Sequence, residues 1–265
     1  MSDFLTYVTL GVVQGLTEFL PVSSTGHLIV ARDLLGLSTE HGLAVDAVLH
    51  LATAFAVVIY FRADLLRLAT SAYAWVRGRA VSASDRVLIL ALILGTIPAV
   101  VVGLLFQESI ESSFRSPELV AYALLLGSLL FFVAERTARH SAELSVKKGF
   151  LIGLFQVLAL IPGMSRSGAT ISGGLLLGMR REDAARFAFL LSFPVILGAG
   201  LVKFLELDSG GVLATSGTLI ATAAVSAFAS GILAIHFLLT YLKNHTLDVF
   251  IWYRVILAFG ILFFL

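Results

Sequence analysis

Two short polar segments interrupt an otherwise apolar chain, and both follow the same order of residue types. The first is residues 11–27 and the second residues 153–170. Each starts with a Gly-x-x-Gln step, continues through an apolar turn to a proline, and ends in a cluster of serine, threonine and glycine. The first carries Glu18 and His27, whereas the second carries Arg166. Ionisable groups at membrane depth are costly and usually functional, so the repetition predicts one site built from two halves.

The composition predicts a polytopic helical membrane protein. Hydrophobic residues make up 58% of the 265 residues and charged residues only 13%, and the mean hydropathy is +0.99. Soluble domains are less apolar and more charged. The net charge of +1 gives no reason to expect a nucleic-acid partner, and the lack of cysteine excludes disulfides and thiolate chemistry. We expect an all-α fold that forms one integral membrane domain, 1–265, in contact with membrane lipids.

Six apolar segments are expected to be transmembrane helices, because each is long enough to cross most of a hydrocarbon core of about 30 Å. They lie at about 45–61, 87–106, 118–134, 187–204, 215–241 and 249–265. The two polar segments, within about 4–30 and 149–178, are broken by proline and small residues. Such backbone persists at membrane depth only inside protein or beside water, so we interpret both as re-entrant broken helices.

Lysine and arginine predict the direction of the spans, because they concentrate in cytoplasmic loops. They are frequent in 62–86, 135–148 and 179–186 and rare in 31–44, 107–117 and 205–214. Six spans then thread with both termini outside. The first broken segment enters from outside and the second from the cytoplasm. Opposite entry indicates an inverted-topology repeat, with repeat 1 at about 4–134 and repeat 2 at about 149–265.

The first segment offers an acid, an amide, hydroxyls and an imidazole. Gln14 and Glu18 are four residues apart, so a helix places both on one face. His27 follows Ser24 by three residues and is expected to reach its hydroxyl. The residues after Pro21 suit a turn or helix cap that leaves backbone N–H groups free; they are Ser23, Ser24, Thr25 and Gly26.

The second segment offers a guanidinium among small residues. Arg166 is surrounded by candidates for phosphate binding, namely Ser165, Ser167, Gly168 and Thr170. Free N–H groups, hydroxyls and a guanidinium together suit a phosphate. Simpler alternatives are helix packing for the small residues and a plain ion pair between Glu18 and Arg166. They do not explain why the polar groups concentrate in two matching segments.

Three further places outside the two segments carry polar residues. Asp46 and His50 are four apart near the start of the first span and are expected to support the site rather than contact the substrate. Arg254 lies near the mouth of the last span and is expected to extend toward the membrane surface. Tyr253 is expected to be an aromatic residue of the membrane interface.

The stretches from Glu18 to His27 and from Pro162 to Thr170 closely resemble the bacterial undecaprenyl-pyrophosphate phosphatase family, the type linked to bacitracin resistance. The resemblance covers essentially the whole chain. It implies a hydrolase of the bacterial cytoplasmic membrane that removes the terminal phosphate of undecaprenyl diphosphate. The product carries glycan precursors for the cell wall. The family's motif positions fall on Gln14, Glu18, Ser24, His27, Ser165, Arg166 and Thr170.

For such a substrate, the residues take definite expected roles. Glu18 would hold a divalent cation, Mg²⁺ or Ca²⁺, that balances the diphosphate charge. Arg166 would clamp the terminal phosphoryl group with two hydrogen bonds. The nucleophile stays open between Ser24, His27 and a water positioned by Glu18; Ser24 or water is favoured, with His27 as proton donor or acceptor. The polyprenyl tail would lie between spans and face lipid.

Two questions about the whole molecule complete the expectations. The first broken segment enters from the outer face, so the site is expected to open to the outer, periplasmic side. A lipid transporter or flippase for polyprenyl phosphates is the alternative function, because inverted repeats with broken helices are common in transporters. A homodimer is the expected form of self-association.

Overall fold

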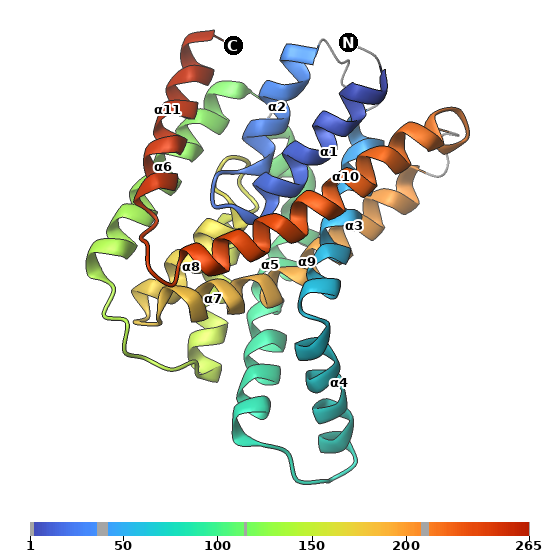
Figure 1. Cartoon of the computed structure of the whole chain (residues 1–265). Helices are drawn as coiled ribbons and strands as arrows, with labels where there is room; N and C mark the ends of the chain where they lie inside the picture. Colours follow the sequence, from blue (N-terminus) through green and yellow to red (C-terminus); the bar gives the residue numbers. More distant parts are fainter. Residues whose placement is uncertain (1–2, 36–41, 114–115, 208–211, 265) are drawn as a thin grey trace.

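The computed structural model describes residues 3–35, 42–113, 116–207 and 212–264, and within them every regular element is helical (Figure 1). The predicted all-α class is therefore confirmed. The helices are α1 Asp3–Phe19, α2 Ser24–Leu35, α3 Gly42–Tyr60, α4 Arg62–Val76, α5 Ala83–Ser113, α6 Pro117–Thr137, α7 Val146–Leu158, α8 Arg166–Leu176, α9 Arg181–Leu207, α10 Val212–Tyr241 and α11 Asp248–Phe264.

Each of the six apolar segments coincides with a helix, although not all six helices meet the requirements of a span alone. In the described residues, α5, α6, α9 and α10 are long and apolar enough to cross a membrane. A fifth crossing results if α3 and α4, which meet at a bend of 78°, count together. α11 has 17 residues and is about 25 Å long, shorter than a typical hydrocarbon core. The protein is therefore a multi-pass membrane protein with four or five established span candidates.

The segment 62–86, predicted as a cytoplasmic loop, contains a helix of its own. α4 packs on the beginning of α5, and the two form a hairpin that extends away from the other helices in Figure 1. Arg67 and Ser71 of α4 both bond to Asp85 of α5. The start of α1 and the end of α11 lie on the side opposite the tip of this hairpin, as the threading requires.

The two broken segments have the same backbone conformation at the break between their helices. α1 and α2 meet at Ser23 and α7 and α8 meet near Ser165, and these serines have φ of 74° and 72°. Left-handed backbone is unfavourable for a residue with a side chain. Each serine Oγ accepts the N–H three residues on, from Gly26 at 3.4 Å and Gly168 at 3.3 Å. The capped turn therefore occurs twice, at the same place in each segment.

Close helix packing also occurs twice. α1 packs along α10 and α7 along α5. A Cβ on Gly15 would overlap Ser230 and the backbone of α10, and one on Gly153 would overlap the Gly95 backbone of α5. Only glycine allows this approach, because it has no side chain. The first helix of each broken segment is thus held in place along its length.

A buried ion pair joins three helices on the side of the α4–α5 hairpin. Glu135, at the end of α6, accepts two hydrogen bonds at 3.0 Å from Arg181 Nε and one at 2.6 Å from its Nη2. It also accepts the Leu247 N–H just before α11 at 2.9 Å. The Glu135 side chain is 1% exposed, so these partners compensate its loss of water.

We expect Glu135→Gln to lower the unfolding free energy by about 3 kcal/mol, the lower end for a broken buried pair, because Arg181 keeps some access to water. The melting temperature in detergent should fall by several degrees. Glu182→Gln is the control, since its pair with Lys243 is exposed on both sides and should contribute less than about 1 kcal/mol. Equal melting temperatures for both variants would contradict this role of Glu135.

Candidate functional site

The carboxylate of Glu18 is the centre of the candidate site and is almost completely buried. α1 places Gln14 and Glu18 on one face, as predicted, and only 0% and 6% of their surfaces are exposed. Gln14 Nε2 donates to Glu18 Oε2 at 3.0 Å. A buried carboxylate needs donors and positive charge around it, so the neighbouring residues are arranged to satisfy Glu18.

Both broken segments supply partners to this carboxylate. Ser24, the first residue of α2, donates from Oγ to Glu18 Oε2 at 3.0 Å. Arg166, the first residue of α8, has Nη1 3.5 Å from Glu18 Oε1. The structure thus brings together the acid of the first segment and the guanidinium of the second. The helices α2 and α8 therefore both begin next to the Glu18 carboxylate.

His27 is held by two hydrogen bonds, neither of them to Ser24. Its Nδ1 lies 2.8 Å from the Ser23 carbonyl oxygen, and because a carbonyl only accepts, Nδ1 carries the proton. Nε2 therefore accepts from the Tyr253 hydroxyl at 2.6 Å. The predicted contact between His27 and the Ser24 hydroxyl is wrong. The left-handed turn at Ser23 offers its carbonyl to the imidazole, and Ser24 donates to Glu18 instead.

Several predicted phosphate-binding residues hold the turns in place. Ser23 and Ser165 cap α2 and α8 through the N–H groups of Gly26 and Gly168. A Cβ on Gly168 would overlap the Phe131 ring. These four residues therefore shape the backbone around the site.

The other hydroxyls of the two segments have different surroundings. Ser167 Oγ donates to the Leu20 carbonyl oxygen at 3.2 Å and so links the second segment to the first. Thr170, fully buried, donates to the Arg166 and Ser167 carbonyl oxygens of its own helix, so its hydroxyl is engaged within α8. Thr25 is exposed. In the described structure the polar partners of Glu18 are other residues, namely Gln14, Ser24, His50 and Arg166.

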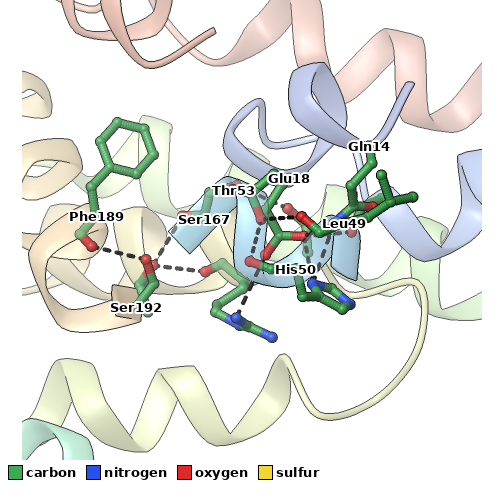
Figure 2. Close-up of polar contacts among 12 residues, drawn as sticks. Gln14, Glu18, Leu49, His50, Thr53, Ser167, Phe189 and Ser192 are labelled. Carbon is green, nitrogen blue, oxygen red and sulfur yellow. Dashed lines mark hydrogen bonds and ion pairs between the residues drawn. The ribbon is translucent and has the colours of Figure 1, made fainter. Parts of the chain in front are cut away.

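His50 joins the site from α3, as expected for a supporting residue. Its Nδ1 lies 3.3 Å from Gln14 Nε2 and 3.7 Å from Glu18 Oε2. Figure 2 shows the three side chains converging. Asp46, one turn earlier, pairs with Arg32 instead. Gln14 therefore bridges the acid and the imidazole.

Two neighbouring residues of α11 contact the two broken segments, and the sequence did not predict either contact. Tyr253 binds His27 of the first segment. Arg254 is fully buried, so its predicted extension to the membrane surface is wrong. Its Nη2 donates to the Gly163 carbonyl oxygen at 3.1 Å in the second segment and to Leu124 at 3.0 Å. The signal was an arginine inside an apolar helix, which by itself suggests function.

The donors that could hold a cation are few. Among the described residues, no group of three or more histidine, cysteine, aspartate and glutamate side chains forms a metal cluster. Around Glu18 the potential ligands are one carboxylate, one amide from Gln14 and one imidazole from His50. The amide oxygen of Gln14 is buried and has no hydrogen-bond partner in the described structure. Oxygen donors of this kind fit Mg²⁺ or Ca²⁺.

The fold and the site define a multi-pass membrane protein with a buried polar centre assembled from two broken helices. The model of the family described as bacitracin resistance protein BacA matches residues 7–260. The chain therefore belongs to the BacA family.

Curated relatives similar to this chain carry the name undecaprenyl-diphosphatase. The protein of Rubrobacter xylanophilus is 44% identical over 264 residues, which cover 97% of each chain. That of Pelobacter propionicus is 42% identical over 258 residues, 96% of this chain and 94% of the relative. That of Mycolicibacterium smegmatis is 41% identical over 265 residues, 98% and 96%. The family match covers both broken segments and most of α11.

We expect Gly127→Ala to lower the free energy of unfolding by about 1–3 kcal/mol, the cost of overpacking. The new Cβ would overlap the Arg254 guanidinium and lie 3.0 Å from the Met164 carbonyl oxygen. Gly198→Ala is the matched control, because nothing lies within 4 Å of its Cβ position; its stability should be unchanged or slightly higher. Melting curves in detergent measure both, and a Gly127→Ala protein as stable as the control would show that α6 and Arg254 are loosely packed.

Proposed function

We infer that this chain is an undecaprenyl-diphosphatase, which hydrolyses undecaprenyl diphosphate to undecaprenyl phosphate and inorganic phosphate. The observation that carries this inference is the meeting of a serine hydroxyl, a buried carboxylate and a guanidinium at two helix N-termini. Membership of the BacA family and the names of the relatives support the substrate. The activity recycles the lipid carrier for cell-wall synthesis.

The geometry favours Ser24 as the nucleophile among the three candidates. Its hydroxyl already donates to Glu18 Oε2, so the carboxylate can take the proton as Oγ attacks the terminal phosphorus. The bond between that phosphorus and the bridging oxygen breaks, and undecaprenyl phosphate leaves. Undecaprenyl phosphate takes with it the proton that Glu18 received, so Glu18 is a carboxylate again. Water then attacks the phosphoserine phosphorus and gives one proton to Glu18; the bond between phosphorus and Ser24 Oγ breaks, Glu18 passes the proton to Oγ, and inorganic phosphate departs. His27 is bonded to Ser23 and Tyr253 and holds the turn.

Arg166 is suited to bind the terminal phosphoryl group. Its Nη1 is buried without a hydrogen-bond partner in the described structure, and its side chain is 21% exposed. The guanidinium can therefore turn toward an incoming phosphate. The N-termini of α2 and α8 add partial positive charge at the same point. Together they stabilise the charge that spreads over the phosphoryl oxygens during transfer.

A divalent cation, Mg²⁺ or Ca²⁺, is proposed as the cofactor, with Glu18 as its carboxylate ligand. When bound, it neutralises part of the diphosphate charge. Its support is the set of donors around Glu18 and the charge of the substrate. The tail of the lipid would lie along the apolar helices, in contact with membrane lipids.

For the architecture, we propose six spans and two re-entrant broken helices in an inverted repeat, about 4–134 and 149–265, in the bacterial cytoplasmic membrane. The repeated capped turn and the paired packing of α1 on α10 and α7 on α5 support it. The charge pattern of the loops supports a site that opens to the outer side. The residues of the described site all come from one chain. A flippase alone would leave the hydrogen bond between Ser24 and Glu18 without a use.

Purified protein in detergent should release inorganic phosphate from undecaprenyl diphosphate, and Arg166→Lys should lower kcat/KM about 100- to 1,000-fold. A lysine offers one point charge where the guanidinium offers two parallel hydrogen bonds. Arg180→Lys is the control, because Arg180 is exposed and pairs with Asp183. Release of no phosphate by the unchanged protein would overturn the proposed function, and full activity in Arg166→Lys would overturn the clamp.

The side on which the site opens can be tested in sealed vesicles with the protein in one known orientation. The position of the α4–α5 hairpin identifies the orientation, because this hairpin should lie inside right-side-out vesicles. Substrate supplied to the outer leaflet should yield phosphate in the external medium. Phosphate that accumulates only inside these vesicles would show that the site opens to the cytoplasm.

A further inference from the structure

Three donor groups from two helices surround one point next to the buried carboxylate. The terminal amide nitrogen of Gln14 is 3.0 Å from Glu18 Oε2 and 3.3 Å from His50 Nδ1, and the last two atoms are 3.7 Å apart. Figure 2 shows these side chains pointing toward one another. Ligands at right angles around a small cation, each at about 2.1 Å, are about 3 Å apart. The three positions therefore have the spacing of one face of a cation site.

The amide of Gln14 is not fully satisfied in its present orientation. Its oxygen is buried without a partner, while its nitrogen occupies the position between Glu18 and His50. The oxygen and nitrogen of a glutamine exchange by rotation about a single bond. That rotation would place Gln14 Oε1 between the carboxylate and the imidazole. Gln14 Oε1, Glu18 Oε2 and His50 Nδ1 could then all coordinate one cation.

The imidazole of His50 is in the form that binds metals. Gln14 Nε2 can only donate, so His50 Nδ1 accepts and carries no proton. A neutral imidazole with a free lone pair is a common metal ligand. The charged groups that face this ring are Glu18 from α1, Arg166 from α8, Asp46 from its own helix and Lys203 from α9. Two of these groups are acidic and two are basic, so their charges balance before a divalent cation binds.

The candidate cation position reaches the surface of the protein at His50. The His50 side chain is 25% exposed, whereas that of Glu18 is 3% exposed. Arg166 lies against the other carboxylate oxygen, Oε1. Oε2 accepts hydrogen bonds from Ser24 and Gln14, and rotation of the Gln14 amide frees one of its lone pairs for the cation. A usable site needs such an entry path as well as ligands.

We propose that His50 supplies a nitrogen ligand to the divalent cation of this site, with Glu18 Oε2 and Gln14 Oε1 as its oxygen ligands. The inference rests on the proposed function for the purpose of the cation, and it adds a ligand from α3. An imidazole suits transition-metal ions better than Ca²⁺. The site should therefore bind Mn²⁺ more tightly than Ca²⁺.

The test is Mn²⁺ binding to the full chain in detergent, carrying no histidine tag, followed by electron paramagnetic resonance. The unchanged protein should show modulation from a coordinated nitrogen in the electron spin echo. His50→Gln should lose this modulation and bind Mn²⁺ at least about 10- to 100-fold more weakly, because loss of an outer-shell partner already costs that much. His236→Gln is the control, since His236 is exposed on α10 and bonded to Tyr60.

A second measurement covers the case in which His50→Gln does not fold. Histidine labelled with ¹⁵N in the unchanged protein should alter the modulation, and His27→Gln should keep it. Bound Mn²⁺ without nitrogen modulation, or modulation that survives in folded His50→Gln, would overturn the proposal, as would a lack of Mn²⁺ binding. Phosphate release by the unchanged protein is measured separately, so hydrolysis without nitrogen coordination removes only this inference, and coordination without hydrolysis removes only the proposed function.

Discussion

A single buried carboxylate determines how the two halves of this protein must meet. Glu18 is too deeply buried for water to stabilise its charge, so the protein must supply hydrogen-bond donors and a positively charged side chain instead of water. Ser24 and Gln14 come from the first segment and Arg166 from the second. If either segment moved away, Glu18 would lose part of this compensation. The position of α8 relative to α1 is therefore tied to the same group that we assign to catalysis.

The backbone around Glu18 is strained at two places, and the strain has a use. Ser23 and Ser165 adopt left-handed φ, which costs about 1–3 kcal/mol for such residues. In return, each turn ends one helix and starts another with its N-terminus at the site. Arg254 binds the Gly163 carbonyl oxygen from α11 and His27 binds the Ser23 carbonyl oxygen. Surrounding groups thus hold both turns in a conformation that an isolated peptide would avoid.

Much of this arrangement follows from the sequence, because residue order and charge reveal the two matching segments and their opposite ionisable groups. The spans are also visible, since length and apolarity are local properties. Other contacts are not local. Tyr253 meets His27 across 226 residues of chain, and no periodicity indicates such a pair. The hydrogen-bond partners of Ser24 and His27 depend on the φ of Ser23, which the residue type does not reveal. The helix α4 was missed because its arginines indicated a loop.

The hydrogen bond from Ser167 to the Leu20 carbonyl oxygen has a consequence for how the protein moves. It links α8 directly to the turn after α1, beside the ion pair between Arg166 and Glu18. A rocking motion that alternately exposed the site to the two sides of the membrane would have to break both contacts in each cycle and leave charged groups uncompensated in a low-dielectric region. These two contacts therefore favour a site whose two halves stay together.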